Sequence, residues 1–193
     1  MLRTFIAIDV PTPVKSELDR LEKELKRSGA DVSWVSPERV HLTLKFLGNV
    51  AEESIAEIKQ ALQQVAASSA PFRLQPASCG AFPSLKRMRV VWAGLRGDDG
   101  ALRTLQKRVE AALVPLGFQP EERPFRAHLT LGRVKGRRHL NLLQEALLAR
   151  QDFQAEAFDV TELVLYKSDL RSGGSLYTPL IRAVLAADKT TIQ

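Results

Sequence analysis

The feature that most constrains the fold is a short motif that occurs twice. Residues 39–44 read RVHLTL and residues 126–131 read RAHLTL, 87 positions further along the chain. Apolar helical periodicity around Leu18 recurs around Leu105, at the same offset. Two copies are too few for a solenoid. We therefore expect two similar lobes with approximate two-fold symmetry, packed as one body.

Hydrophobic patterning places regular elements around both copies. Apolar residues three or four apart predict helices over 14–25, 55–65, 102–113 and 140–147. Runs rich in β-branched and aromatic residues predict strands over 4–10, 40–47, 72–82, 88–93, 127–134, 158–166 and 176–184, with a turn at 172–175. Each half reads strand, helix, strand, helix, strand, and the second half adds a strand. We expect one domain of two lobes, approximately 1–85 and 86–193, with exchange of strands between lobes allowed.

The positive charge of the chain is concentrated in one segment. The net charge is +6, and six basic residues with no acidic one lie between positions 123 and 138: Arg123, Arg126, Arg133, Lys135, Arg137 and Arg138. A second cluster, Lys86, Arg87 and Arg89, opens another strand. Charge alone fits a solvated face equally well, but this clustering favours a local anion-binding surface.

Several classes of protein are excluded or disfavoured. A single cysteine, Cys79, forbids an internal disulfide and fits a reducing cytoplasm. No stretch approaches the roughly 18 apolar residues of a membrane span, and the first ten residues read as a strand and not as a signal peptide. Neither a Walker phosphate loop nor a Gly-x-Ser-x-Gly elbow occurs. A zinc site would have to recruit His139 or Cys79, and no spacing supports it. We expect a cytoplasmic protein that does not bind membranes.

The repeated motif suits acid–base chemistry on an anion. Residues two apart on a strand share a face, so His41 projects with Thr43, and His128 with Thr130. If the lobes face each other, these four side chains line one cleft. One neutral imidazole can accept a proton from water while a protonated one supplies a proton to a leaving oxygen. Threonine hydroxyls can donate to phosphate oxygens. A cyclic phosphodiester fits this set, because its leaving oxygen stays tethered.

These residues resemble a known family. The two His-x-Thr-x copies look like the paired motifs of the 2H phosphoesterase superfamily, and their surroundings resemble its LigT-like branch, the RNA 2′,3′-cyclic phosphodiesterases also called 2′-5′ RNA ligases. The resembling context spans nearly the whole chain: residues 5–8 (FIAI), Trp34, 45–48 (KFLG), 82–84 (FPS), 91–95 (VWAGL), Arg133, Leu170 and 174–177. Ala127 departs from a frequent proline, which we expect to alter only the entry into the strand.

The resemblance implies an α+β fold: bilobal, with two pseudo-symmetric lobes of antiparallel sheet, outer helices and a central cleft. It implies hydrolysis of RNA 2′,3′-cyclic phosphate ends to 2′-phosphomonoesters, without a metal or cofactor. By this analogy His41 is the proton donor to the 3′ oxygen and His128 is the proton acceptor that activates water. Because the two motifs are nearly identical, they do not by themselves show which histidine donates the proton and which accepts it. In reverse, the same site would join such an end to a 5′-hydroxyl end through a 2′-5′ linkage.

Three further residues are expected to contact substrate. Phe46 follows His41 by five positions, and Arg133 follows His128 by five. Odd spacing on a regular strand turns both away from the histidines, so they reach the cleft only through a bulge or at the end of a strand. The family pattern suggests that Arg133 touches phosphate and that Phe46 stacks on a base, although Phe46 also fits the core. Tyr177 is a third candidate for ligand contact.

The expected partners are RNA ends or nucleotides with a 2′,3′-cyclic phosphate, tRNA halves among them, bound by a monomer. Two alternatives stay open. A non-catalytic RNA-binding module would bind more weakly in salt and respond little to histidine substitution. A ligase would use the same site in the joining direction.

Overall fold

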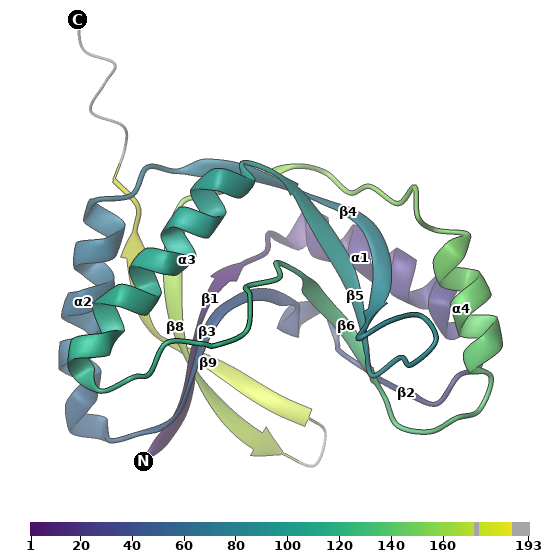
Figure 1. The fold of residues 1–193 in the computed structure, drawn as a ribbon, viewed down its shortest axis with the longest axis horizontal. Coiled ribbons are helices and arrows are strands. Elements are labelled where there is room, and N and C mark those ends of the chain that lie inside the picture. The colour runs from purple at the N-terminus through teal and green to yellow at the C-terminus, as the bar shows by residue number, and fades with distance from the viewer. Residues whose placement is uncertain (172–173, 187–193) are drawn as a thin grey trace, which may run out of the picture.

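The computed structural model describes residues 1–171 and 174–186, in which nine strands form one sheet flanked by four α-helices (Figure 1). The strands are β1 (Leu2–Asp9), β2 (Val32–Trp34), β3 (His41–Val50), β4 (Phe72–Phe82), β5 (Val90–Gly97), β6 (Leu129–Val134), β7 (Phe158–Val160), β8 (Glu162–Arg171) and β9 (Gly174–Val184). The helices are α1 (Thr12–Lys26), α2 (Ile55–Ala67), α3 (Asp99–Leu113) and α4 (Leu140–Leu148). The predicted turn at 172–175 includes residues 172 and 173, which lie outside the described residues.

The predicted α+β class, helices and strands are confirmed, with two differences. The short strand β2 was not predicted, because three residues are too few to show a period. The run predicted as one strand over 158–166 divides into β7 and β8, which pair with β4 and with β1 in opposite halves of the sheet. Alternation shows which face of a strand is buried, but it does not show which neighbour the strand pairs with.

The sheet consists of two halves with a narrow joint between them. Its order is β7-β4-β5-β6-β3-β1-β8-β9, with β2 beside β6. In the middle, β6 and β3 share a single pair, Leu42 with Leu129. Strands from both sides of the boundary predicted at residues 85 and 86 contribute to each half of the sheet, and the division into lobes stays a prediction.

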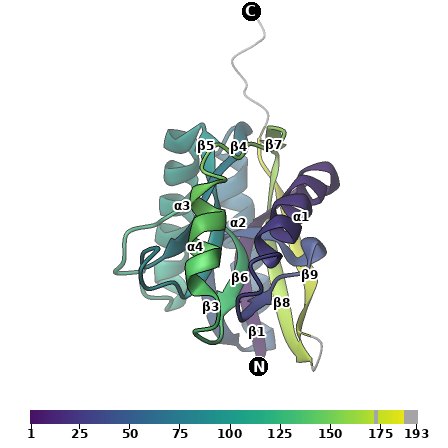
Figure 2. The same ribbon diagram turned by 90° about the vertical axis from the view of Figure 1, so that its right-hand side faces the viewer.

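The helices cover the two halves in pairs. Helices α2 and α3 pack together against the half that contains β3 and β9, while α1 lies beside α4 at the other half (Figures 1 and 2). Helix α1 therefore leaves the half that holds β1, although it follows β1 directly in the chain. None of the described helices is long and apolar enough to cross a membrane.

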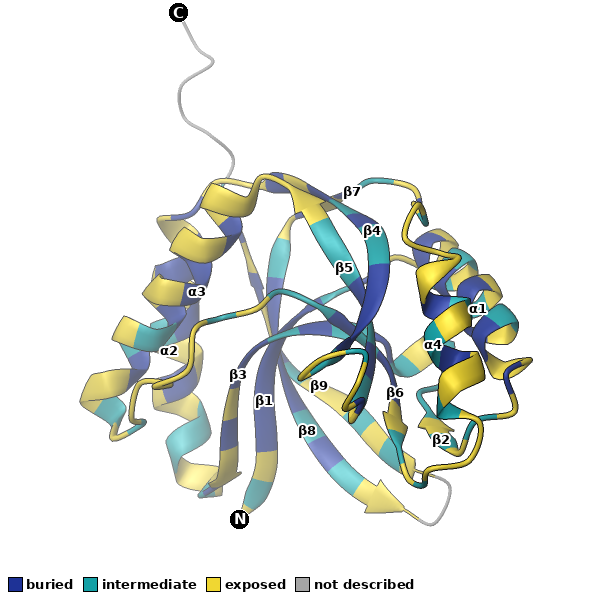
Figure 3. Ribbon diagram, turned by 45° about the vertical axis from the view of Figure 1, so that its right-hand side comes forward, coloured by how far each residue is buried: buried dark blue, intermediate teal, exposed yellow. Residues whose placement is uncertain are grey.

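The apolar faces of the helices and one face of the sheet form the main core (Figure 3). Along β1, Ile6 and Ile8 enter this core, whereas Phe5 and Ala7 point to the opposite face. There they form a small second cluster with Val164 and Tyr166, against which Tyr177 packs. Burial on both faces makes β1 a rigid support for what lies on that second face.

Candidate active site

The two His-x-Thr motifs meet at the joint of the sheet. Leu42 of β3 and Leu129 of β6 are direct antiparallel partners and are both buried. The register of this pair places His41 opposite Thr130 and Thr43 opposite His128. The side chains of these four residues project from the face of the sheet opposite to the one that carries the two leucine side chains. The fold thus brings the four residues of the repeat into one cluster.

Both imidazole rings are held by the same kind of hydrogen bond. Nδ1 of His41 lies 2.7 Å from the carbonyl oxygen of Arg39, and Nδ1 of His128 lies 2.7 Å from the carbonyl oxygen of Arg126. A carbonyl only accepts, so Nδ1 carries the proton in each ring. Nε2 is then the nitrogen that can give or take a proton. Ala127 does not disturb this geometry at the second motif.

Aromatic side chains surround each ring. Phe5 stacks on His41 with centroids 4.7 Å apart, and Tyr177 meets the same ring edge-on at 5.2 Å. On the other side, Phe82 meets His128 edge-on at 5.0 Å. These contacts restrict the orientation of each imidazole ring.

Burial and charge act on both histidines. Burial lowers the pKa of His41 below its usual value, opposed by the hydrogen bond to the Arg39 carbonyl and by the charge of Asp9, while Lys15 and His128 lower it further. Burial also lowers the pKa of His128, opposed by its own carbonyl bond, and the Arg133 charge adds to the lowering. The sites therefore differ: a carboxylate favours the charged form of His41, and a guanidinium disfavours that of His128.

The two threonine hydroxyls are available for a ligand. Thr43 and Thr130 are both half-buried, and within the described part of the chain neither hydroxyl has a hydrogen-bond partner. Each can therefore donate to a phosphate oxygen placed between the imidazoles.

Matching β-bulges follow the two motifs. Against β1, Thr43 pairs with Ala7 and Lys45 pairs with Ile6, which leaves Leu44 without a partner. Against β5, Thr130 pairs with Trp92 and Gly132 pairs with Val91, which leaves Leu131 without one. One extra residue reverses the alternation beyond it.

The bulges turn Phe46 and Arg133 to the side of the histidines. Phe46 is 62% exposed, and its ring centroid lies 5.8 Å from that of Phe5. Lys45 takes the inward position and is buried. Phe46, Arg133 and Tyr177 all line one cavity of about 420 Å³, whose floor includes Phe5. The three residues predicted to contact substrate are thus brought together.

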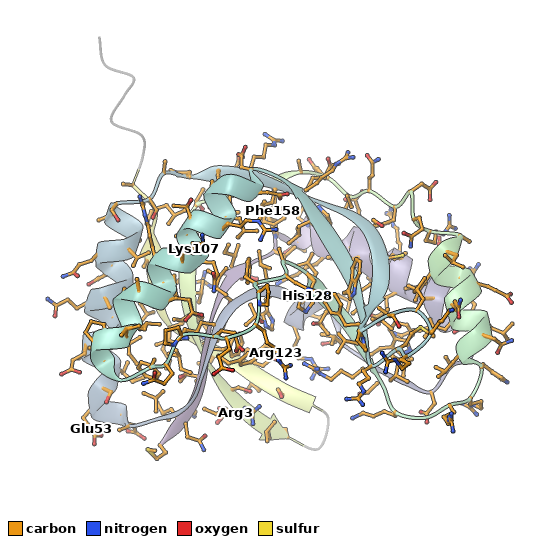
Figure 4. All side chains as sticks on the ribbon, in the orientation of Figure 1. Arg3, Glu53, Lys107, Arg123, His128 and Phe158 are labelled. Atoms are coloured by element: carbon orange, nitrogen blue, oxygen red, sulfur yellow. The ribbon has the colours of Figure 1, made fainter. Side chains whose placement is uncertain are left out.

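A larger cavity of about 1090 Å³ lies beside His128 and Thr43. The loop between α3 and β6 forms one wall, and Arg123 of this loop lines the cavity together with His128 (both labelled in Figure 4). Arg123 and Arg126 line this cavity, so the predicted basic segment runs along both cavities. Its remaining members, Lys135, Arg137 and Arg138, are exposed in the β6–α4 connection.

The sequence did not identify several residues that shape the site. Asp9 is the β1 partner of His41 in the sheet and binds Lys15 at 2.9 Å and the Tyr166 hydroxyl at 3.2 Å. The segments that resemble the family include Phe5 and Phe82, but no role in the site was predicted for either residue. Their positions beside the histidines depend on strand pairing, which the sequence does not show. Among the described residues, no three His, Cys, Asp or Glu side chains gather as ligands for a metal.

The known proteins that resemble this chain belong to the family that its two His-x-Thr motifs indicate. A profile of the 2′-5′ RNA ligase superfamily matches residues 10–171. The RNA 2′,3′-cyclic phosphodiesterase of Methanothermobacter thermautotrophicus is 33% identical over 179 residues, which cover 93% of this chain and 96% of that protein.

Solved structures match over nearly the whole chain. The TT0787 protein of Thermus thermophilus superimposes with a TM-score of 0.80 and 26% identity, covering 97% of this chain and all of that one. Escherichia coli LigT in complex with 3′-AMP gives a TM-score of 0.76 and 26% identity, with 95% and 98% coverage.

Proposed function

The chain belongs to the 2′-5′ RNA ligase superfamily, and on that premise we propose that it hydrolyses RNA 2′,3′-cyclic phosphate ends to 2′-phosphomonoesters. The observation that carries this proposal is the meeting of the two His-x-Thr motifs at the Leu42–Leu129 pair, with both Nε2 atoms available. The relatives named RNA 2′,3′-cyclic phosphodiesterase favour an enzyme over a non-catalytic RNA-binding module.

We propose that His41 is the general acid and His128 the general base. The Asp9 carboxylate favours a proton on His41, as an acid requires, while Arg133 disfavours a proton on His128, as a base requires. His128 removes a proton from water as the water attacks phosphorus. His41 gives a proton to the 3′ oxygen as the bond from phosphorus to that oxygen breaks.

The other side chains position the phosphate and its nucleoside. Thr43 and Thr130 donate to the two non-bridging phosphate oxygens and stabilise the negative charge that grows in the transition state. Arg133 adds a charged contact to the same phosphate. Phe46 and Tyr177 hold the nucleoside that bears the cyclic phosphate, because both line the cavity that Phe5, the residue stacked on His41, also lines.

One chain supplies the complete cluster, which supports action as a monomer. Any RNA end with a cyclic phosphate is a candidate substrate, and we include tRNA halves in the proposal. If a 5′-hydroxyl replaces water as the attacking group, the same steps form a 2′-5′ linkage.

The test is hydrolysis of a short RNA with a 2′,3′-cyclic phosphate, in the presence of EDTA. We expect His41→Asn and His128→Asn each to lower turnover by about 10²–10⁴-fold, the usual contribution of a positioned acid or base. His139→Asn is the matched control, because His139 is exposed and its φ of 53° suits asparagine. Wild-type turnover in either of the first two variants would overturn the mechanism.

A further inference from the structure

The cavity that Phe46 and Tyr177 share carries a net positive charge. Two arginines line it, Arg133 and Arg3, and among the described residues around it there is no Asp or Glu. In the larger cavity beside His128 the formal charges cancel. The charged residues that line that larger cavity are Lys45, Arg123, Arg126, Glu110, Glu121 and Glu122. The smaller cavity therefore favours a ligand with more than one negative charge.

Only one of these two positive charges has a role in the reaction proposed above. A 2′,3′-cyclic phosphate carries a single negative charge, which Arg133 contacts. Arg3 (labelled in Figure 4) is exposed on β1, and its side chain has no ion pair or hydrogen bond with the described residues. The neighbouring cation Lys167 of β8 instead pairs with Asp169 at 3.0 Å. Arg3 is thus available for an anionic ligand.

Strand pairing places a polar side chain on either side of Arg3. On β3 its partner is Asn49. On β8 the antiparallel register that pairs Thr4 with Lys167 puts Ser168 beside Arg3. Asn49 and Ser168 line the same cavity as Arg3. A guanidinium, an amide and a hydroxyl can all donate hydrogen bonds to the oxygens of a phosphate.

The same strand sets the distance of Arg3 from the proposed acid. Phe5 is stacked on His41, and Arg3 lies two residues before Phe5 on the same face of β1. A strand rises about 3.4 Å per residue, so Arg3 lies roughly 7 Å beyond Phe5, on the side away from His41. The part of the cavity that Phe5 and Phe46 line therefore separates Arg3 from the position of the cyclic phosphate.

We propose that Arg3, together with Asn49 and Ser168, binds the phosphate on the 5′ side of the nucleoside that bears the cyclic phosphate. This rests on the function proposed above, in which Phe46 and Tyr177 hold that nucleoside. Because the cyclic phosphate closes the 2′ and 3′ oxygens, an RNA chain continues from this nucleoside only through its 5′ oxygen. The terminal nucleotide therefore has a phosphate at each end, and the cavity supplies an arginine for each.

This site would distinguish an RNA end from a cyclic mononucleotide. A nucleoside 2′,3′-cyclic phosphate with a free 5′-hydroxyl lacks the second negative charge, whereas the end of an RNA chain always carries it. Because Arg3 is exposed, we expect the extra contact to change kcat/KM by about tenfold, near the weak end for a hydrogen bond to a charged group.

The test compares three substrates that share one terminal base. They are adenosine 2′,3′-cyclic phosphate, the same compound with a 5′-phosphate, and the dinucleotide ApA with a 2′,3′-cyclic phosphate. Chromatography of the 2′-phosphomonoester products below saturation gives kcat/KM for each. We expect the wild type to prefer the second and third substrates to the first by about tenfold. This preference should fall as the salt concentration rises.

Variants of the polar residues address the site itself. Arg3→Gln should remove most of the preference for a 5′-phosphate, because it keeps a hydrogen-bond donor but loses the charge, and Arg3→Lys should restore part of it. Ser168→Ala should lower the preference by a smaller factor. Arg20→Gln is the matched control, because Arg20 is exposed on α1, outside the residues that line the cavity.

The outcomes separate this inference from the proposed function. Equal kcat/KM of the wild type for the three substrates overturns the 5′-phosphate site and leaves the phosphodiesterase intact. A preference for the dinucleotide alone also overturns it, because the second nucleoside would then be the group recognised. A full preference for a 5′-phosphate in Arg3→Gln overturns the role of Arg3. Absence of hydrolysis of all three substrates overturns the proposed function, and this site with it.

Discussion

The buried pair of Lys45 and Glu110 provides a direct test of how the site is held. Their side chains are 6% and 14% exposed, and the Nζ–Oε2 distance is 2.5 Å. Lys45→Met keeps the length of the side chain but leaves the largely buried Glu110 carboxylate without its cation, with the Gln106 side-chain amide at 3.2 Å and the Glu121 backbone N–H at 3.4 Å as its remaining donors. Breaking a buried pair in this way costs about 3–5 kcal/mol of the free energy of unfolding.

This loss is large enough to measure by thermal unfolding. In a chain of this size each 1 kcal/mol shifts Tm by about 2–4 °C, so Lys45→Met should lower Tm by roughly 6–20 °C. Lys107→Met is the matched control, since Lys107 is exposed on the neighbouring helix α3. Its free energy of unfolding should change by less than about 0.5 kcal/mol.

A double-mutant cycle separates the ion pair from the packing of each side chain. Glu110→Leu alone should be as costly as Lys45→Met, because it leaves the ammonium group buried without an anion, although Lys45 Nζ still donates to the carbonyl oxygen of Gln119 at 2.8 Å. The double variant should lose less than the sum of the two, with a coupling of at least about 1 kcal/mol. The ion pair would not stabilise the fold as described if the losses in free energy of unfolding of the two single variants added up in the double variant to within about 0.5 kcal/mol. A loss below about 1 kcal/mol for Lys45→Met would contradict it as well.

Two further predictions concern the nucleoside cavity and the sheet. Phe46→Ala should raise KM for a cyclic-phosphate dinucleotide about tenfold with little change in kcat, because it removes one base stack. Leu148→Ala is the control, because Leu148 is also exposed but lies on α4, and it should change neither constant. An unaltered KM in Phe46→Ala would count against stacking. Gly132→Ala should lower the free energy of unfolding by about 1–3 kcal/mol, since its Cβ would lie 2.6 Å from Cγ1 of Val32. Gly100→Ala is the control, because its Cβ would meet no neighbouring atom. Equal denaturation midpoints for the two variants would contradict the predicted clash at Gly132.

Much of the fold was predictable because it follows from local patterns. Helix α1 shows the three-and-four spacing of Val14, Leu18, Leu21 and Leu25, and all four are buried. The repeated motif likewise predicted that His41 and His128 would share one site. Local patterns of this kind do not show which half of the sheet a helix covers, and α1 packs away from the strand that precedes it.

The positions of the two bulges could not be predicted from the sequence. The odd spacing from His41 to Phe46 indicated that a bulge or the end of a strand was needed, but did not say which. Leu44 and Leu131 are ordinary strand residues, and only the pairing of β1 with β3 and of β5 with β6 shows that each lacks a partner. A bulge is a property of two strands together, so one strand's sequence does not locate it.

The chemical difference between the two motifs also comes from pairing, and it can be tested by pH. The charges that bear on His41 are Asp9 from β1, Lys15 from α1 and His128. The Asp9 charge raises the pKa of His41 and the Lys15 charge lowers it. If His41 is the acid, activity is lost on the alkaline side when this residue deprotonates.

Asp9→Asn and Lys15→Gln should therefore move the alkaline limb of the profile of kcat/KM in opposite directions. Asp9→Asn removes a charge that stabilises the imidazolium, so the pKa of His41 falls and the limb moves to lower pH; Lys15→Gln moves it to higher pH. Tyr166→Phe is the control, because it removes a hydrogen bond to Asp9 and leaves the carboxylate charge in place. If Asp9→Asn shifted the acidic limb instead, His41 would be the base, and the two histidines would have to exchange roles.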